Sequence, residues 1–170
     1  MTSLQAAIPR AVDADVERAF LEILRRKVTG PISLYVSAVR AVEEAYGPQA
    51  RDMIRDRQLQ ESVDRAARQG AIAADNSLKA FCTALEQGCC GSHEWEKLED
   101  TPTRQAYRFT RCMWADVFRS LGAEDIGISI CEGDGPAAAA FNPEIRFGRT
   151  ETLMGGDDCC DHVYYVEEET

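Results

Sequence analysis

The chain has 170 residues, of which 45% are hydrophobic and 28% are charged, and this composition is typical of a folded globular domain. Nineteen Lys and Arg residues against 29 Asp and Glu residues give a formal net charge of -10. A molecule of this charge repels phosphate backbones and anionic lipid surfaces, so we expect neither a nucleic acid nor a membrane as partner. The length fits a single domain over residues 1–170.

The N-terminal residues contain neither the basic region nor the apolar run of a secretory signal. No apolar run approaches the roughly 18 to 20 residues of a membrane-spanning helix. We therefore expect a soluble, cytoplasmic protein. The seven cysteines are odd in number and include two adjacent pairs, at 89–90 and 159–160, so we expect thiols rather than a disulfide framework.

Residues 1–90 carry apolar side chains at helical spacing, interrupted by Gly and Pro. Four helices are predicted: from Asp13 or Asp15 to a stop at Gly30-Pro31, from 32 to 46, from about 49 to a stop at Gly70, and from a cap at Asn76 or Ser77 to Gly88. This helical part offers a surface for a homo-oligomer.

Residues 91–170 change character and predict a sheet. Aromatic residues at alternate positions flank a turn at 100–103, which predicts a hairpin of strands 93–98 and 106–111. A helix from Met113 to Leu121 follows, and Asp134 is expected to cap a short helix at 137–141. Alternation at 145–149 and 162–166 predicts a second antiparallel hairpin. The fold class is therefore α+β, a helical N-terminal half followed by an antiparallel sheet with a packed helix.

Cys160 and His162 are two residues apart on the last predicted strand, so both side chains project from one face, about 6.5 to 7 Å apart. A thiol beside an imidazole forms a nucleophile or supplies two ligands to zinc. The structural alternative is a buried Cys next to a surface His. Cys112 and Cys131 equally fit the role of small buried hydrophobes, and His93, on a weaker strand pattern, is a minor candidate.

Several common motifs are missing from the sequence. There is no Cys-x-x-Cys, no Gly-x-Gly-x-x-Gly and no Gly-x-Ser-x-Gly, and the Gly-rich segment 88–92 lacks the Lys-Ser or Lys-Thr of a phosphate-binding loop. The arginines between 51 and 68 alternate with acidic residues and indicate a solvated helix face. Nucleotide cofactors and serine-hydrolase chemistry therefore have little support.

Six blocks, at 107–118, 121–122, 130–134, 141–145, 149–153 and 156–162, resemble the L-2-amino-thiazoline-4-carboxylic acid hydrolase family in order and spacing. The resemblance covers about residues 93–166. The recurring features of that family fall on Cys112, Cys131, Asp134, Arg149, Gly156, Cys160 and Asp161. The family pattern has Phe or His at position 162.

The resemblance implies a bacterial hydrolase that opens a cyclic isothiourea or related amidine ring by C–N or C–S cleavage and yields a carbamoylated cysteine. It suggests Cys160 as nucleophile, with Cys131 as second choice, and Asp134 as the group that holds the amidinium. His162 would be the general base. Arg149, or alternatively Arg111, would bind the substrate carboxylate, with Cys112 and Asp161 completing the substrate-binding set.

Two alternatives use the same residues. In the first, Cys131, Cys160 and His162 or Asp134 hold zinc, and a bound water is the nucleophile. In the second, the chain is a non-catalytic module that senses a small molecule or a metal. The leading hypothesis requires no cofactor, and zinc is the cofactor of its first alternative.

Overall fold

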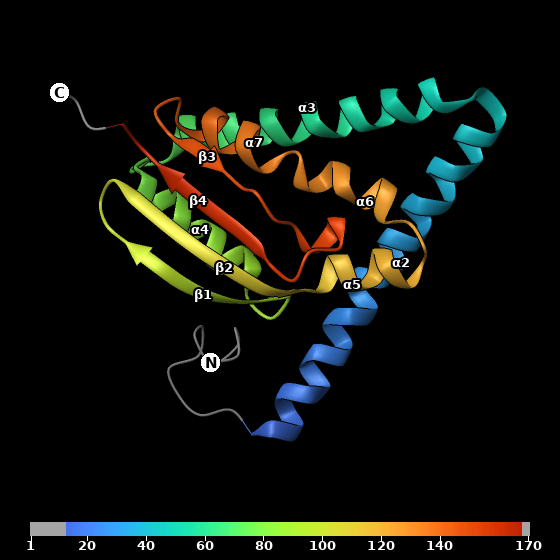
Figure 1. The fold of residues 1–170 in the computed structure, drawn as a ribbon, viewed down its shortest axis with the longest axis horizontal. Coiled ribbons are helices and arrows are strands. Elements are labelled where there is room, and N and C mark those ends of the chain that lie inside the picture. The colour runs from blue at the N-terminus through green and yellow to red at the C-terminus, as the bar shows by residue number, and fades with distance from the viewer. Residues whose placement is uncertain (1–12, 168–170) are drawn as a thin grey trace.

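The computed structural model describes residues 13–167 and has the predicted α+β architecture (Figure 1). Its elements in chain order are α2 (Ala14–Tyr46), α3 (Pro48–Ile72), α4 (Leu78–Cys89), β1 (His93–Asp100), β2 (Arg104–Cys112), α5 (Met113–Ser120), α6 (Glu124–Cys131), α7 (Asp134–Phe141), β3 (Arg146–Gly148), the 3-10 turn η1 (Leu153–Gly155) and β4 (Cys160–Tyr165). Among the described helices, none is both long enough and apolar enough to cross a bilayer.

The four strands form one antiparallel sheet in the order β1-β2-β4-β3. Both predicted hairpins are therefore confirmed. His93 pairs with Cys112 between β1 and β2, and Phe109 pairs with Cys160 between β2 and β4. Because neighbouring strands run in opposite directions, the start of β1, the end of β2 and the start of β4 lie at the same end of the sheet. This end of the sheet carries the candidate site.

Helix α2 corrects one prediction, because it continues through Gly30-Pro31 as a single helix of 33 residues. Proline lacks the N–H that would bond the carbonyl four residues earlier, and this loss usually ends or kinks a helix. Here Ile32 and Val39 are buried in a core with α5 and α6, so packing beyond the proline outweighs the lost bond. The helix ends at Gly47, as predicted.

Helix α3 also runs past its predicted stop at Gly70 and ends at Ile72. A Cβ atom at position 70 would lie 2.0 Å from the backbone oxygen of Phe141 at the end of α7. The glycine therefore permits close approach of two helices rather than ending one. Ser77 caps α4 as expected, with its hydroxyl accepting a hydrogen bond from the Ala80 N–H at 3.2 Å.

Two predictions around α6 and α7 are incomplete or wrong. Residues 124–131 form a helix that the sequence pattern did not reveal, and Gly127 within it lies so close to Met154 and Phe118 that a Cβ would clash with both. Asp134 is the first residue of α7 and its side chain makes no capping hydrogen bond. Its carboxylate instead accepts a hydrogen bond from Arg149.

The core has two parts. One lies between the sheet, α4 and α7 and contains Tyr107, Phe109 and Tyr164; the other lies between α2, α5 and α6 and contains Val117 and Phe118. Leu153 in η1 packs against both. The candidate site draws residues from both parts of the core. All seven cysteines are thiols, as predicted.

Candidate functional site

A cavity of about 200 Å³ lies at the end of the sheet where β1 and β4 begin and β2 ends. Strand ends, helix ends and the segment after β3 each contribute side chains to it. Its lining residues are Leu85, Cys89, His93, Phe109, Cys112, Trp114, Ile130, Cys131, Asp134, Arg149, Met154, Cys160 and His162. Most of the sequence-predicted candidates therefore meet in one cavity, although they are spread over 51 residues, from Cys112 to His162.

Asp134 and Arg149 form the ionic part of the cavity wall. Arg149 Nη1 donates hydrogen bonds to Asp134 Oδ2 at 2.8 Å and to the Cys131 backbone oxygen at 3.2 Å. About a third of the Asp134 side chain is exposed, and the residue lines a cavity whose other walls are mostly apolar, so its carboxylate is poorly solvated. This desolvation raises the pKa of Asp134 to about 6, although the nearby Arg149 guanidinium acts to lower it.

His162 lies beside this pair on β4. Its Nε2 is 3.8 Å from Asp134 Oδ2, its Nδ1 is 3.3 Å from the Tyr164 hydroxyl, and its ring packs against Phe109 with centroids 4.9 Å apart. Burial lowers the pKa of His162 to about 3, with Arg149 acting in the same direction. The imidazole is therefore neutral over the physiological pH range and is a weak base.

Cys160 opens β4, with its side chain on the same buried face as His162, as the alternation predicted. Its Sγ accepts a hydrogen bond from the Leu153 N–H at 3.2 Å and lies 3.7 Å from the Thr152 hydroxyl. Cys160 thus reaches the cavity with a donor already in place.

Three further thiols line the cavity. Burial raises the pKa of Cys112 to about 11 and that of Cys89 and Cys131 to about 12. Cys112 also serves a structural role, since its sulfur accepts the Ala115 N–H at the start of α5. These three side chains therefore remain protonated at neutral pH and form an apolar, polarisable wall.

Two predicted substrate-binding residues lie outside the cavity. Arg111 Nη1 is 3.0 Å from Glu94 Oε1, and Arg111 Nε is 3.6 Å from Asp116 Oδ2. The guanidinium therefore forms ion pairs outside the cavity. The Asp161 carboxylate accepts hydrogen bonds from the backbone N–H groups of Thr150 and Glu151, and from the Thr150 hydroxyl. Asp161 thereby holds the segment that follows Arg149.

One comparison with known proteins agrees with the resemblance seen in the sequence. The family model for L-2-amino-thiazoline-4-carboxylic acid hydrolase matches residues 25–164. The chain belongs to this family. No curated protein is significantly similar to the chain in sequence. Among solved structures, the phenol-responsive sensory domain of the transcription activator PoxR, crystallised with phenol, is similar over 78% of this chain and 73% of that chain, with 14% sequence identity and a TM-score of 0.45.

In this member of the hydrolase family, much of the apolar lining of the cavity has no recognisable signal in the sequence, notably Leu85 and Cys89 of α4 and Trp114 of α5. His93 was only a minor candidate, yet it lines the cavity, and burial lowers its pKa to about 4. The register of the first hairpin carries the relevant signal, because it places His93 opposite Cys112. Within residues 13–167, no group of three or more His, Cys, Asp and Glu side chains is arranged to hold a metal ion.

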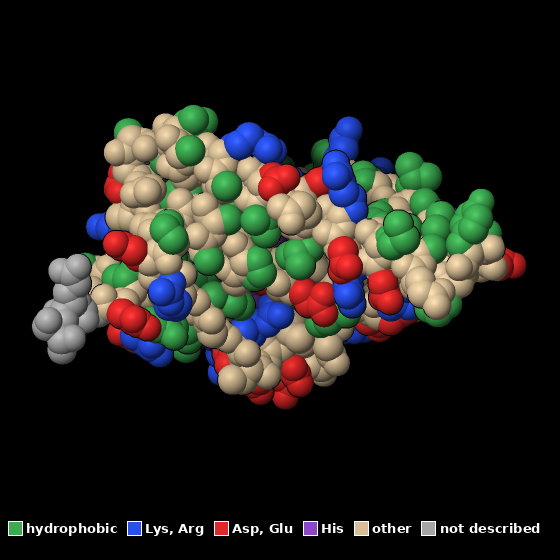
Figure 2. Space-filling view, turned by 90° about the horizontal axis from the view of Figure 1, so that it is seen from above, with side chains coloured by type: hydrophobic (Ala, Val, Ile, Leu, Met, Phe, Trp, Pro, Cys, Tyr) green, Lys and Arg blue, Asp and Glu red, His purple; other side chains and the backbone are tan. Residues whose placement is uncertain are grey.

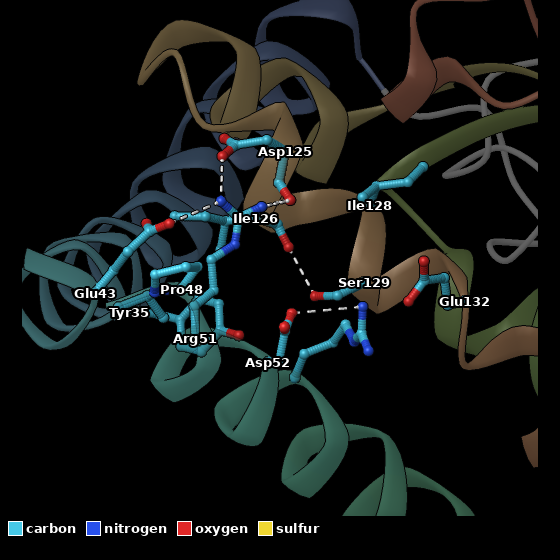
Figure 3. Close-up of a pocket in the computed structure, with 12 residues that line it drawn as sticks. Tyr35, Glu43, Pro48, Arg51, Asp52, Asp125, Ile126, Ile128, Ser129 and Glu132 are labelled. Atoms are coloured by element: carbon cyan, nitrogen blue, oxygen red, sulfur yellow. Dashed lines mark hydrogen bonds and ion pairs between the residues drawn. The ribbon is translucent and has the colours of Figure 1, made fainter. Parts of the chain in front are cut away.

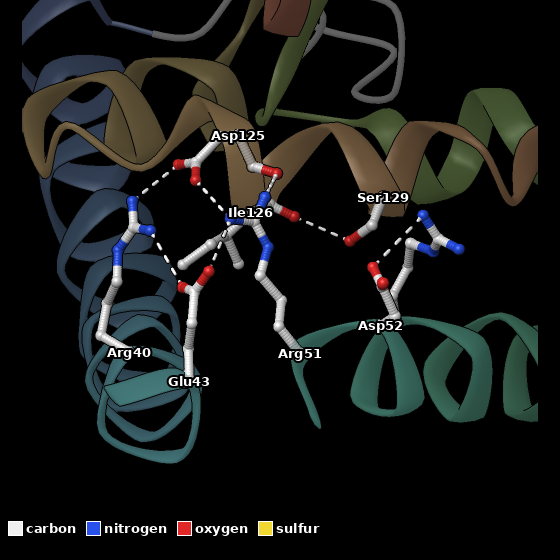
Figure 4. A network of polar contacts seen from close by, with 8 residues as sticks. Arg40, Glu43, Arg51, Asp52, Asp125, Ile126 and Ser129 are labelled. Carbon is white, nitrogen blue, oxygen red and sulfur yellow. Dashed lines mark hydrogen bonds and ion pairs between the residues drawn. The ribbon is translucent and has the colours of Figure 1, made fainter. Parts of the chain in front are cut away.

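A second cavity, of about 220 Å³, lies between α2, α3 and α6 (Figure 3). Its charged residues bind one another. Arg40 and Arg51 both reach the Asp125 carboxylate, at 2.7 and 2.8 Å, and Arg51 also donates to the Asp125 backbone oxygen at 2.6 Å (Figure 4). Glu43 of α2 pairs with the same two arginines. This network fastens α6, whose last residue is Cys131, to the long helices.

Proposed function

We propose that the chain is a hydrolase that opens a small cyclic amidine or isothiourea ring, 2-aminothiazoline-4-carboxylate or a related heterocycle, with Cys160 as nucleophile. One observation carries the proposal: a thiol with a backbone donor, a carboxylate of raised pKa and an arginine line one small cavity in a member of this family. Each of the three groups matches one part of such a substrate.

Cys160 is the preferred nucleophile among the four thiols of the cavity. Its sulfur accepts the Leu153 N–H, whereas burial holds Cys131 and Cys112 in the thiol form by raising their pKa values. The thiolate is the attacking species in covalent catalysis. Cys131 remains the second choice because it lies next to the Arg149–Asp134 pair.

Asp134 is the preferred proton carrier. A carboxyl group with a pKa of about 6 exchanges protons readily near neutral pH, whereas an imidazole with a pKa of about 3 is too weak a base for this task. In the ionised form, Asp134 can also accept hydrogen bonds from the two nitrogens of an amidinium. His162 then acts as a neutral neighbour of Asp134, 3.8 Å away.

In the first step, the Cys160 thiolate adds to the ring carbon between nitrogen and sulfur, and the ring nitrogen takes up a proton. The tetrahedral adduct collapses with cleavage of either the C–S or the C–N ring bond, and the leaving atom is protonated. Water then adds to the same carbon and the Cys160 thiol departs, which leaves a carbamoyl product. Over the whole cycle the substrate gains one water molecule and Cys160 is regenerated, so no oxidant or reductant is needed.

Arg149 is the preferred partner for the substrate carboxylate. In the described part of the chain, its side-chain hydrogen bonds to protein both come from Nη1, which leaves Nε and Nη2 for a ligand. A guanidinium binds a carboxylate with two parallel hydrogen bonds. Arg111, the alternative in the sequence, is already paired with Glu94 and Asp116.

The test is the turnover of 2-aminothiazoline-4-carboxylate by the purified full chain, with the product mass followed in ordinary and in ¹⁸O-labelled water and the metal content measured on the same sample. The proposal expects a mass gain of one water, with one labelled oxygen in the carbamoyl group and activity that resists chelator. Loss of activity to chelator with recovery on added zinc would establish the zinc alternative. No turnover of this ring or its oxygen and nitrogen analogues would favour the sensing module.

A further inference from the structure

The long helix α2 carries an exposed stripe that the proposed function does not use. In the view of Figure 1, the other described elements all lie to one side of α2. Leu24, Val28, Ile32 and Val39 face these elements and are buried or partly buried. The residues on the outer flank repeat at intervals of three and four and are all exposed; they are Val16, Phe20, Ile23, Lys27, Gly30, Leu34, Ala38, Ala41 and Ala45. Phe20 is the least exposed of the large apolar members, at 41%, because one edge of its ring lies against Gly91 of its own chain. We name this set the α2 seam.

The α2 seam is apolar in a strongly acidic molecule. Lys27 is its one charged residue, and none of its nine members is acidic. Val16, Ile23 and Leu34 leave 60%, 57% and 73% of their surface exposed, and because they share one side of the helix they belong to a continuous apolar stripe. A stripe that repeats every three or four residues along a helix is the pattern that packs against another helix.

The order of large and small side chains along the α2 seam favours a second copy of this chain as the partner. The bulky residues Val16, Phe20 and Ile23 occupy the N-terminal half, and Ala38, Ala41 and Ala45 occupy the C-terminal half. The three bulky residues are spaced four and then three positions apart, counted from Val16 toward the C-terminus. The three alanines have the same spacing, counted from Ala45 toward the N-terminus. A second copy in antiparallel orientation therefore places Val16 and Ile23 opposite Ala45 and Ala38, and the exposed part of Phe20 opposite Ala41.

The residues at the centre of the α2 seam are also compatible with an antiparallel pair. In the same register, Lys27 lies opposite Leu34, and Gly30 lies next to the twofold axis. A Cβ at position 30 would meet no atom within 4 Å, so the backbone is open to close approach at that point. The alkyl part of Lys27 can cover Leu34 while its ammonium group reaches water. A parallel pair would instead place Phe20 against Phe20 and Ala41 against Ala41, leaving gaps at one end.

We infer that the α2 seam is an interface between two copies of this chain, related by a twofold axis near Gly30. The seam is roughly 44 Å long at 1.5 Å per residue, and a helix is about 10 Å across. The two copies would bury on the order of 1,000 Å² together, which is the lower limit for a specific interface. We therefore expect a weak dimer that dissociates on dilution.

The exposed end of the molecule near the turn between α2 and α3 is also hydrophobic (Figure 2). Tyr46 and Met53 leave 76% and 73% of their surface exposed there. Ala45, the last residue of the α2 seam, directly precedes Tyr46 in the chain. In the antiparallel register, this end meets the N-terminal end of the other copy, so the apolar surface continues beyond the seam.

Sedimentation equilibrium of the full chain, without substrate, tests the inference independently of any catalytic activity. At about 50 μM the wild type should be dimeric, and Ala38→Glu should weaken the dimer about tenfold or more, because the new carboxylate would face Ile23. Ala67→Glu, on an exposed position of α3, is the matched control and should leave the dimer intact. A monomeric wild type, or a dimer that Ala38→Glu does not weaken, would overturn the inference.

Disulfide formation tests the antiparallel register. Ile23→Cys and Ala38→Cys variants, mixed and oxidised, should give a covalent dimer that neither variant gives alone above the wild-type background. Covalent dimers from Ala38→Cys alone would establish a parallel pair and overturn the register. Circular dichroism of each variant verifies that α2 remains folded.

Discussion

Arg149 Nη1 and Asp134 Oδ2 are 2.8 Å apart, and this contact joins the start of α7 to the segment that follows β3. The same nitrogen donates to the backbone oxygen of Cys131 at the end of α6. One guanidinium therefore fixes three separate segments around the cavity. It also sets the ionisation of Asp134, since the pKa of that carboxyl reflects desolvation on one side and the positive charge of Arg149 on the other.

The pH dependence of the reaction should report Asp134. With its pKa raised to about 6, the carboxylate is lost as pH falls below that value, so kcat/KM should decline on the acid side with an apparent pKa near 6. Asp134→Asn should lower the rate and abolish this acid limb. His162 should not contribute to the limb, because its pKa is about 3. An acid limb near 6 that persists in Asp134→Asn would contradict the assignment.

The raised pKa of Asp134 also makes the free energy of unfolding depend on pH. The dependence is opposite to that of a carboxylate whose pKa is lowered by an ion pair. The folded-state pKa of Asp134 lies above the usual value of 3.8, so the folded protein binds a proton more readily than the unfolded chain between these values. The contribution of Asp134 to the free energy of unfolding should therefore decrease as pH rises from about 4 to above 6. Urea unfolding of wild type and Asp134→Asn at both pH values measures the difference.

Replacement of Arg149 by Met should have two separable effects. KM for a carboxylate-bearing ring should rise about tenfold or more, whereas kcat/KM for the same ring without its carboxylate should change less. The acid limb should also move to higher pH, because Arg149 lowers the pKa of Asp134. Arg111→Met is the matched control. Equal losses of kcat/KM on both substrates would show that Arg149 does not bind the substrate carboxylate.

The close contact between α3 and α7 predicts a contrast between two glycines in helices. Gly70→Ala should destabilise the fold by about 2 kcal/mol, because its Cβ would overlap the Phe141 carbonyl. Gly88→Ala, in α4 with no atom within 4 Å of the new Cβ, should be neutral or stabilise by up to about 1 kcal/mol. Chemical unfolding of both variants measures this, and equal effects would contradict the packing.

The network around Asp125 should stabilise the attachment of α6. Arg51→Met should lower the free energy of unfolding by about 1 kcal/mol, since Arg51 bonds both the carboxylate and the backbone oxygen of a partly exposed residue. Arg57→Met removes only an exposed pair with Glu61 within α3 and should cost less than about 0.5 kcal/mol. High salt should reduce the difference between them.

The sequence predicted the sheet well because alternation and turn residues are local signals. It misplaced helix ends at Gly30-Pro31 and Gly70, because packing against distant segments decides both cases. Strand alternation pointed to Cys160 and His162, and the resemblance to the hydrolase family pointed to most of the other candidate residues, which one cavity brings together. The two that lie outside, Arg111 and Asp161, have partners whose proximity depends on strand register and loop path, which spacing alone does not reveal.

The central claim is that Cys160 is the nucleophile of this cavity. The most direct measurement is kcat/KM for 2-aminothiazoline-4-carboxylate in Cys160→Ser, beside Cys131→Ser and Cys159→Ser. Cys159 is the matched control, since it is the adjacent residue in the chain and its sulfur binds Glu151 outside the cavity. We predict a loss of at least about a thousandfold in Cys160→Ser and a loss of less than about tenfold in Cys159→Ser. Near wild-type activity in Cys160→Ser would contradict the account.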